Sequence, residues 1–316
     1  MNFYGALVRM PAHPPEASLR RWKYLVDVGL WPRMVEFNWR GWLQNFNEAE
    51  MPFAVRLLDS FLYFSQPMTR QLFRSAFLSV SERIVTKQAL PRAQAQWSSF
   101  VDELIVVRVT GERPSTADSG YAFARFARDD LEIAESQLLE PSQAIGRMLR
   151  DRSGDVMFVD DFVGSGTQFN KSWTRRIDVS GQPRLLSFRD VALGHPGKFR
   201  FFLCTALATK YGFESIHTVA PEVMPMSGQI LDARASATSR PSFIWREDME
   251  ESGPAFIRSA SQRAGIPFTE GVEDEWNGFH GLGLTVAFSH GWPDATLPLF
   301  HWDKNGWIPL LVKGAV

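Results

Sequence analysis

The spacing of apolar residues changes along the chain at about residue 95. Over residues 19–90, apolar residues recur every three or four positions and glycine is rare, which is typical of helices. The clearest run places the following residues at helix spacing: Phe53, Leu57, Leu58, Phe61, Leu62, Leu72, Phe73, Ala76, Phe77 and Val80. Pro67 separates two helices within this run, and Ser65 and Thr69 can cap the second. The pattern predicts an N-terminal helical region over residues 1–95.

In the second part of the chain, short apolar runs alternate with helical patterns. Runs of strand length, rich in Val, Ile, Leu and Phe, cover residues 103–110, 155–162, 200–209 and 215–221. Helical patterns between these runs cover residues 119–133 and 166–178. Nearly continuous apolar strands suit parallel sheets covered on both faces, and the alternation of strand and helix implies right-handed crossovers. We therefore expect an α/β domain over residues 96–316, with a mostly parallel sheet flanked by helices.

Two segments lack a clear period. Residues 91–100 are polar and contain a proline, so they predict a connector between the two regions. Residues 228–242 are the least patterned part of the chain and predict a mobile loop. No internal repeat or low-complexity tract is seen elsewhere.

Charge and cysteine content narrow the possible classes of protein. The 34 basic and 35 acidic residues give a net charge of -1. This excludes nucleic-acid binding through a global positive field, but it leaves direct binding through a local basic patch open. Cys204 is the only cysteine, so the chain has no internal disulfide and no cysteine-based zinc cluster. It lies in the apolar run 201–206, which favours a buried structural thiol.

The sequence gives no sign of a membrane protein. Its N-terminus lacks the basic segment and long apolar segment of a signal peptide. No apolar stretch approaches the roughly 18 residues of a membrane span. We expect a cytoplasmic protein with no membrane partner.

The segment 155–173 carries the strongest chemical signal. Its apolar strand, residues 156–159, leads directly into Asp160 and Asp161. In open α/β sheets, ligands bind at the carboxyl ends of the strands, where these acids are expected. Neighbouring carboxylates can accept hydrogen bonds from vicinal ribose hydroxyls, or hold Mg²⁺ through water. We therefore predict that the pair binds a sugar and that neither acid is buried in the core.

The residues that follow the acids suit an anion. Gly164, Ser165 and Gly166 permit a tight turn whose backbone amides point inward. A helix predicted to begin near Thr167 adds its positive end and its free N–H groups. One contiguous stretch would then bind both the sugar hydroxyls and a 5′-phosphate.

Other strand-to-helix motifs compete with this interpretation. A Walker B strand also ends in acids, but the chain has no glycine-rich loop that ends in Gly-Lys-Ser or Gly-Lys-Thr. A dinucleotide-binding fingerprint needs a third glycine at the position of Phe169. A plain structural turn between strand and helix stays open as an alternative.

The strand, acid pair, two apolar residues and loop resemble the 5-phosphoribosyl-diphosphate (PRPP) signature of type I phosphoribosyltransferases. By this resemblance, Asp160 and Asp161 are the catalytic pair that binds ribose and Mg²⁺. The 5′-phosphate is assigned to a loop of five residues: Gly164, Ser165, Gly166, Thr167 and Gln168. Two of these positions depart from the family pattern. Many base-transferring members have an acid or threonine in place of Gly164, which removes a possible general base here, and a hydroxyl residue in place of Gln168.

The resemblance also implies a diphosphate site after the first strand of the sheet. Asp118, Ser119 and Gly120 lead into a helix at this point. Ser119 and Gly120 would offer backbone N–H groups to the diphosphate, and Arg113 or Arg125 a positive charge. An ordinary capped helix is the alternative.

The C-terminal part predicts one more strand, over residues 284–288, followed by a polar loop. His290 in this loop could join the site as an acid, a base or an orienting group. His280, His290 and His301 do not have the helical i, i+4 spacing of a metal site, and nearby prolines favour loops. We expect them to be loop histidines without a metal.

Together with the segments 118–128 and 290–300, the site resembles a phosphoribosyltransferase-like family of bacterial antiviral conflict systems. The resemblance covers most of residues 40–312. Some relatives are encoded beside retron reverse transcriptases. The resemblance implies a defence role as an effector or accessory component, with a reverse transcriptase or another defence protein as partner. It also implies PRPP or a nucleotide as ligand and Mg²⁺ as cofactor.

The sequence leaves two kinds of activity open. An enzyme would transfer a phosphoribosyl group, or strip a base from a nucleotide, through an oxocarbenium-like transition state. A catalytically inactive module would bind a nucleotide and a partner, which fits Gly164 in place of a catalytic acid. A high tryptophan content in the helices predicts a partner-binding surface, with core packing as the alternative. The tryptophans concerned are Trp22, Trp31, Trp39 and Trp42.

Overall fold

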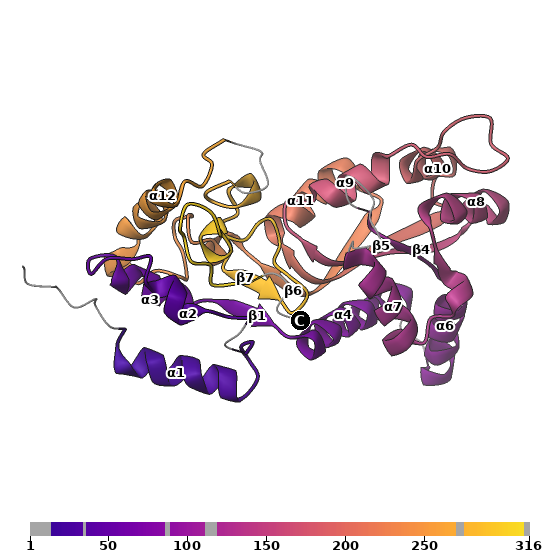
Figure 1. Ribbon diagram of the computed structural model, residues 1–316. Helices are drawn as coiled ribbons and strands as arrows, with labels where there is room; N and C mark the ends of the chain where they lie inside the picture. Colours follow the sequence, from indigo (N-terminus) through magenta and orange to yellow (C-terminus); the bar gives the residue numbers. More distant parts are fainter. Residues whose placement is uncertain (1–13, 34–35, 86–88, 111–118, 270–274, 313–316) are drawn as a thin grey trace, which may run out of the picture. The chain divides into compact units, whose positions relative to one another are not determined.

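The computed structural model describes residues 14–33, 36–85, 89–110, 119–269 and 275–312 (Figure 1). The chain divides into two compact units by its contacts. One unit combines Met1–Ser65 with Arg234–Val316, and the other is Gln66–Ala233. This division differs from the one expected at residue 95. The sheet unit includes helices from the first region, and the other unit joins the two ends of the chain.

The Gln66–Ala233 unit is built on a five-stranded parallel sheet with the strand order β3-β2-β4-β5-β6. The strands are β2 (Ile105–Arg108), β3 (Leu138–Leu139), β4 (Gly154–Val163), β5 (Phe199–Thr209) and β6 (Val223–Leu231). Long parallel strands in the middle of a sheet are apolar because both of their faces are covered. The expected α/β class, with a mostly parallel sheet flanked by helices and an N-terminal helical region, is confirmed.

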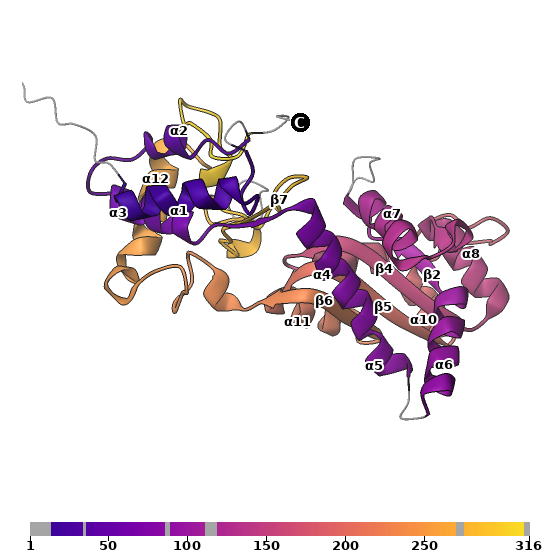
Figure 2. The same ribbon diagram turned by 90° about the horizontal axis from the view of Figure 1, so that it is seen from below.

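Helices cover both faces of this sheet (Figures 1 and 2). One face carries α4 (Gln66–Ser79), α5 (Ser81–Ile84), α6 (Leu90–Glu103) and α7 (Ser119–Leu131). The other carries α8 (Pro141–Asp151), α9 (Thr167–Thr174), α10 (Phe188–Gly194) and α11 (Lys210–Val219). Side chains alternate along β4: Met157 packs in the core on the α4–α7 side and Phe158 in the core on the α8–α11 side.

The position of α4 explains why the expected division at residue 95 differs from the observed one. Phe73, Ala76 and Phe77 on this helix are buried and pack in the same core as strands β4 and β5. Leu72 touches β6 so closely that a Cβ on Gly228 would come within 2.3 Å of the Leu72 carbonyl oxygen. The periodicity of a helix shows that it has a buried face, but it does not show which partner buries that face.

The other unit is built from both ends of the chain. Its helices are α1 (Glu16–Asp27), α2 (Trp39–Leu43), α3 (Met51–Asp59) and α12 (Ser252–Ala264). Its strands β1 (Leu62–Phe64) and β7 (Val286–Phe288) form a parallel pair. Short 3₁₀ turns complete the described chain: η1 (Glu135–Gln137), η2 (Ala233–Ala235), η3 (Glu247–Met249), η4 (Phe279–Gly281) and η5 (Pro298–Phe300).

The tryptophans expected on a partner surface lie in the core of this unit. Trp22 and Trp42 are fully buried, and Trp31 and Trp39 are at most 7% exposed. The ring of Trp22 packs edge-on against Trp39, with centroids 5.3 Å apart. The indole N–H of Trp42 donates to the carbonyl oxygen of Leu299, 2.7 Å away. The prediction that these four side chains form a partner surface is therefore wrong, because their rings pack against each other and the C-terminal segment.

Three sequence expectations about single elements are also wrong. Residues 91–100 belong to helix α6 rather than to a connector, because Trp97 and Phe100 place one face of the helix against the core. Residues 215–219 end helix α11 rather than forming a strand. Their β-branched residues are typical of strands, yet only Ile216 on the inner face of this segment is fully buried.

The third wrong expectation is the mobile loop at 228–242, because its first four residues complete β6. Pro225 and Gly228 hide this strand in the sequence. Both residues are tolerated here because β6 lies at the edge of the sheet. The strand expected at 284–288 is present as the shorter β7.

Cys204 is completely buried in β5, as expected, and this burial raises the pKa of its thiol. The described helices include none that combines the length and apolar character needed to cross a membrane.

Candidate functional site

The acid pair lies on a part of β4 that extends past the end of its neighbour β2. β2 ends at Arg108, which pairs in register with Val159. Just after β2, the backbone N–H of Val109 donates a hydrogen bond to the Val159 carbonyl oxygen of β4, at 3.0 Å. β4 continues to Val163 on the β5 side alone. The acids therefore do not follow the strand, as the sequence predicted, but form part of its one-sided extension.

Asp160 is buried, with 3% of its surface exposed, while Asp161 is half-buried. The expectation that neither acid is buried is wrong for Asp160, because its backbone stays in the sheet, in register with Thr205 of β5. The carboxylate of Asp160 accepts a hydrogen bond from the backbone N–H of Asp161 at 3.0 Å. This bond links the two acids directly.

Thr205 lies beside Asp160 and is fully buried. Its hydroxyl oxygen has no hydrogen-bond partner among the residues that the structure describes. A buried polar atom without a partner costs free energy and calls for a reason, such as a ligand or water that completes the site. No pattern in the sequence marks Thr205 as part of the site. It could be found only after the register of β4 and β5 was known.

The loop after the acids makes the turn that the sequence predicts, and α9 begins at Thr167. Gly166 caps this helix with φ at +79°, in the left-handed region that glycine prefers. The hydroxyl of Ser165 donates to the hydroxyl of Thr167 at 2.9 Å and accepts the Thr167 N–H at 3.3 Å. Ser165 is buried and Gln168 is exposed. Ser165 and Thr167 thus satisfy part of their hydrogen-bonding capacity within the loop.

The glycines of this loop also have a packing role against α11. A Cβ on Gly166 would lie 2.7 Å from the carbonyl oxygen of Gly212, and one on Gly212 would lie 2.3 Å from that of Gly164. Thr209 joins the two segments: its hydroxyl donates to the Gly164 carbonyl oxygen at 2.5 Å and accepts the Gly212 N–H at 2.9 Å. A tight turn is therefore needed here whether or not an anion binds.

Thr209→Val should loosen this loop without unfolding the protein. The change removes two hydrogen bonds from a nearly isosteric, 4% exposed side chain, which costs about 1–3 kcal/mol of the free energy of unfolding. We expect faster amide hydrogen exchange over residues 164–168, measured by mass spectrometry. Thr209→Ser keeps the hydroxyl and should retain the exchange rate of the wild type. Equal exchange in Thr209→Val and the wild type would contradict the role of Thr209.

Hydrogen bonds join the end of β2 to α9. The candidate diphosphate loop and the candidate phosphate loop therefore adjoin segments that contact each other. The backbone N–H of Thr110 donates to the hydroxyl of Ser172 at 3.1 Å, and that hydroxyl donates to the Thr110 carbonyl oxygen at 2.9 Å. Arg175 adds a hydrogen bond to the Thr110 hydroxyl at 3.0 Å. Thr110 immediately precedes the proposed diphosphate loop, while Ser172 lies on the helix that begins at the proposed phosphate loop.

The candidate diphosphate residues are only partly described. Asp118 and Arg113 lie outside the described residues, and α7 begins at Ser119. Gly120 packs against the end of β2, where a Cβ would lie 2.7 Å from the carbonyl oxygen of Val109. Gly120 thus has a structural reason to be glycine. Arg125 lines a pocket beside α7.

The acid pair suits Mg²⁺ only if a ligand supplies the remaining oxygens. In the described parts of the chain, no group of three or more His, Cys, Asp or Glu side chains could hold a metal. Mg²⁺ commonly binds through one or two carboxylates together with substrate phosphates. The buried Asp160, the half-buried Asp161 and the nearby Thr205 hydroxyl fit that pattern.

The C-terminal histidines pack against aromatic rings in the other unit. His290 stacks on Phe288 with ring centroids 5.2 Å apart, and His301 on Trp292 at 4.8 Å. His280 has a left-handed backbone, with φ at +56°. These contacts show the packing of the histidines.

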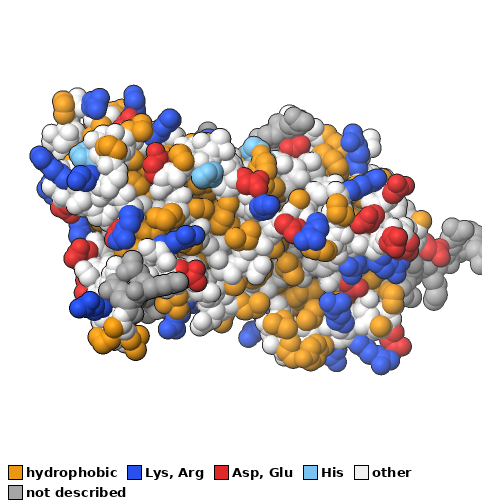
Figure 3. All heavy atoms as spheres, turned by 180° about the vertical axis from the view of Figure 1, so that it is seen from behind, with side chains coloured by type: hydrophobic (Ala, Val, Ile, Leu, Met, Phe, Trp, Pro, Cys, Tyr) orange, Lys and Arg blue, Asp and Glu red, His pale blue; other side chains and the backbone are white. Residues whose placement is uncertain are grey.

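Charges of both signs are interspersed on the molecular face seen in Figure 3. This agrees with the nearly balanced composition of 34 basic and 35 acidic residues. No extended single-sign surface is visible on that face, so recognition is better sought in local sites.

The PRTase-CE family, a phosphoribosyltransferase-like family, matches residues 39–313. The chain belongs to this family. The match spans both compact units, including the acid pair and the loop after it. The phosphoribosyltransferase-like family expected from the sequence is thereby confirmed. No curated protein matches this PRTase-CE chain.

Proposed function

We propose that this PRTase-CE protein binds PRPP or a nucleotide at the carboxyl edge of its sheet. Asp160 and Asp161 bind the ribose hydroxyls, and residues 164–168 bind the 5′-phosphate at the start of α9. One observation carries the proposal: a single segment runs from a buried acid into a left-handed turn and a helix N-terminus. Beside that acid lies the Thr205 hydroxyl, which has no hydrogen-bond partner among the described residues. Carboxylates suit vicinal hydroxyls, and helix N-termini suit phosphate.

The proposed chemistry separates anchoring from reaction. The loop holds the 5′-phosphate, and the acids hold the ribose, so both ends of the sugar are positioned. Ser119 and Gly120, at the start of α7, offer N–H groups to a diphosphate. Mg²⁺ held by Asp160 and Asp161 would offset negative charge on a departing diphosphate. The reaction proposed is transfer of a phosphoribosyl group, or the removal of a base from a nucleotide.

A catalytically inactive nucleotide-binding module is the second candidate. The specific observation in favour of this module is the packing role of Gly164. Gly164 stands where many base-transferring enzymes have an acid or threonine, and its carbonyl oxygen is bound by Thr209 and packed against Gly212. Position 164 thus serves packing and offers no side chain for proton transfer.

We also propose a role as effector or accessory of an antiphage system, with a reverse transcriptase or other defence protein as partner. That role rests on the family resemblance.

Calorimetric titration of the full chain with PRPP, and separately with AMP, in the presence of Mg²⁺ tests the proposal. We expect binding of at least one ligand, weakened by inorganic phosphate, which competes for the loop. Diphosphate release from bound PRPP, or base release from bound nucleotide, would identify an enzyme. A ligand recovered intact would identify a binding module. Absence of binding for both ligands would contradict the proposal.

A further inference from the structure

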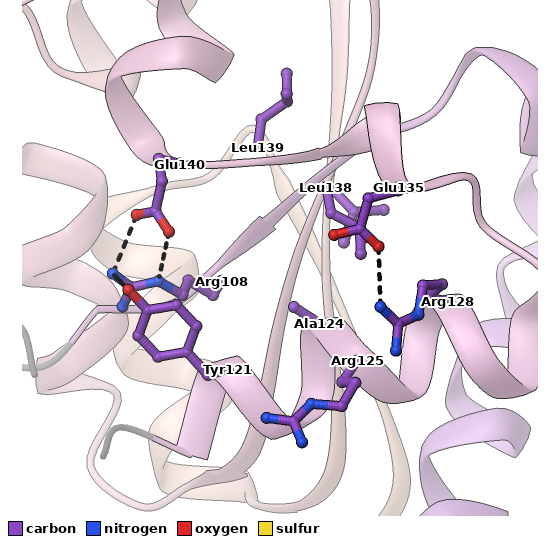
Figure 4. A pocket seen from close by; sticks show the side chains of 10 residues that line it. Arg108, Tyr121, Ala124, Arg125, Arg128, Glu135, Leu138, Leu139 and Glu140 are labelled. Atoms are coloured by element: carbon purple, nitrogen blue, oxygen red, sulfur yellow. Dashed lines mark hydrogen bonds and ion pairs between the residues drawn. The ribbon is translucent and has the colours of Figure 1, made fainter. Parts of the chain in front are cut away.

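A pocket lies beside α7, apart from the acid pair and its loop. It has a volume of about 230 Å³. Residues of β2, α7 and the segment 135–140 line it: Val106, Arg108, Tyr121, Ala124, Arg125, Arg128, Glu135, Leu138, Leu139 and Glu140 (Figure 4). No residue of β4 or of the loop 164–168 is among them. Val106 packs in the core on the α4–α7 side of the sheet, so the pocket opens on that side.

Two of the three arginines in the pocket are held by acids. Arg108 is 8% exposed and donates two hydrogen bonds to Glu140, at 3.3 and 3.0 Å. Its guanidinium also lies over the ring of Tyr121, 3.8 Å from the centroid, and donates to the Tyr121 hydroxyl at 2.9 Å. Arg128 donates to Glu135 at 3.0 Å. These ion pairs give the walls of the pocket a defined geometry.

Arg125 differs from the other two. It projects from α7 between Tyr121 and Arg128 (Figure 4) and is exposed. Within the described parts of the chain, no carboxylate lies within ion-pair distance of it. The lining has three arginines and two glutamates. Just outside it, the carboxylate of Asp129 accepts a hydrogen bond from Arg128 at 2.8 Å and also interacts with Arg125. Arg125 lies beside an apolar floor that includes Val106 and Leu138.

The size and charge of the pocket restrict its ligand. Its volume is below the roughly 300–1,000 Å³ of pockets for drug-sized ligands, so a dinucleotide or a nucleic-acid strand does not fit. A phosphate ester carries about 1.5–2 negative charges at neutral pH. The single charge of Arg125 does not balance them beside Glu135 and Glu140. A carboxylate carries one charge and matches the planar guanidinium of Arg125. An apolar body would contact the floor.

We propose that this pocket binds a small monocarboxylate with a hydrocarbon body, at a site separate from the ribose-phosphate site. Arg125 binds the carboxylate, and the Arg108–Glu140–Tyr121 cluster forms the rigid wall beside it. The site has a direct connection to the sheet edge, because Arg108 precedes the Val109–Thr110 segment held by β4 and α9. A bound carboxylate therefore stabilises the end of β2, from which the proposed diphosphate loop begins.

Fluorine NMR of 4-fluorobenzoate with the full chain tests this inference. We expect line broadening with wild type, and at least tenfold weaker binding with Arg125→Ala. Ala124→Met, which fills the pocket, should have the same effect. Arg184→Ala is the matched control, since Arg184 is an exposed arginine of the same unit outside the pocket, and it should bind as the wild type does. Lack of binding, or equal binding by Arg125→Ala, would overturn the proposal.

Two further measurements separate this site from the ribose-phosphate site and from a phosphate site. PRPP should not displace 4-fluorobenzoate, and Asp160→Asn/Asp161→Asn should still bind it. Displacement by PRPP, or loss in that double variant, would show that the pocket belongs to the ribose-phosphate site. Displacement of the probe from the wild type by inorganic phosphate would show a phosphate site and overturn the carboxylate proposal. Failure of both PRPP and AMP to bind would contradict the proposed function and leave this result intact.

Discussion

Gly166→Ala will destabilise the protein by about 2–5 kcal/mol, because left-handed strain of roughly 1–2 kcal/mol adds to an overpacking cost of about 1–3 kcal/mol. The backbone at Gly166 has φ at +79°, where a side chain is strained. Its Cβ would also lie 2.7 Å from the carbonyl oxygen of Gly212, which is backbone and cannot rotate away. Urea unfolding of the wild type and the variant measures the loss.

Gly181→Ala is a matched control for the strain alone. Gly181 has the same φ of +79°, but a Cβ there would meet no atom within 4 Å. This variant should lose only about 1–2 kcal/mol. The difference between the two variants reports the close packing of the phosphate loop on α11. Equal losses in both variants would show that the loop can move away from α11. In that case we would also expect phosphate binding to survive in Gly166→Ala.

Asp160→Asn and Asp161→Asn should each weaken binding of PRPP or AMP about 10- to 150-fold, since each removes a charged hydrogen-bond acceptor worth about 1.5–3 kcal/mol. The double variant should show no measurable binding by calorimetry. Asparagine at position 160 keeps an oxygen that can accept the Asp161 N–H. We therefore expect circular dichroism and cooperative unfolding to remain those of a folded protein.

Asp155→Asn provides the control on the same strand. Asp155 lies at the opposite end of β4 and accepts two hydrogen bonds from Arg200, both at 2.6 Å. Its replacement should lower stability and leave ligand affinity unchanged. Equal affinity in a folded Asp160→Asn/Asp161→Asn variant would exclude the acids from ribose binding. Equal loss in all three variants would point to a general effect of charge or stability.

The parts of the fold that could be predicted are those encoded by local patterns. The strands β2, β4 and β5 are continuous apolar runs, and α9 follows a glycine-containing turn, so each is visible in a short window. β6 was missed because an edge strand tolerates Pro225, which a central strand does not. The pairing of β1 with β7 joins segments from opposite ends of the chain. No local pattern specifies such a pairing.

The candidate site shows the same limit. Asp160, Asp161 and the glycine loop form one contiguous motif and were identified from sequence. Thr205 and Thr209 lie about 45 residues further along the chain and reach the motif only through the pairing of β4 and β5. The burial of Asp160 follows from that pairing as well. The order of strands in the sheet decides which strand lies beside the motif, and that order depends on all the strands together.

The discontinuous unit has a consequence for biosynthesis. Helices α1, α2 and α3 leave the ribosome before the sheet unit and long before α12 and β7, with which they share a core. Domains generally fold as units during synthesis, so the continuous Gln66–Ala233 segment can fold first. Meanwhile Trp22 and Trp42, fully buried in the finished protein, lack their C-terminal partners. Nascent chains stalled before residue 234 should therefore recruit chaperones through this aromatic segment, and release them once the C-terminal strand β7 has emerged.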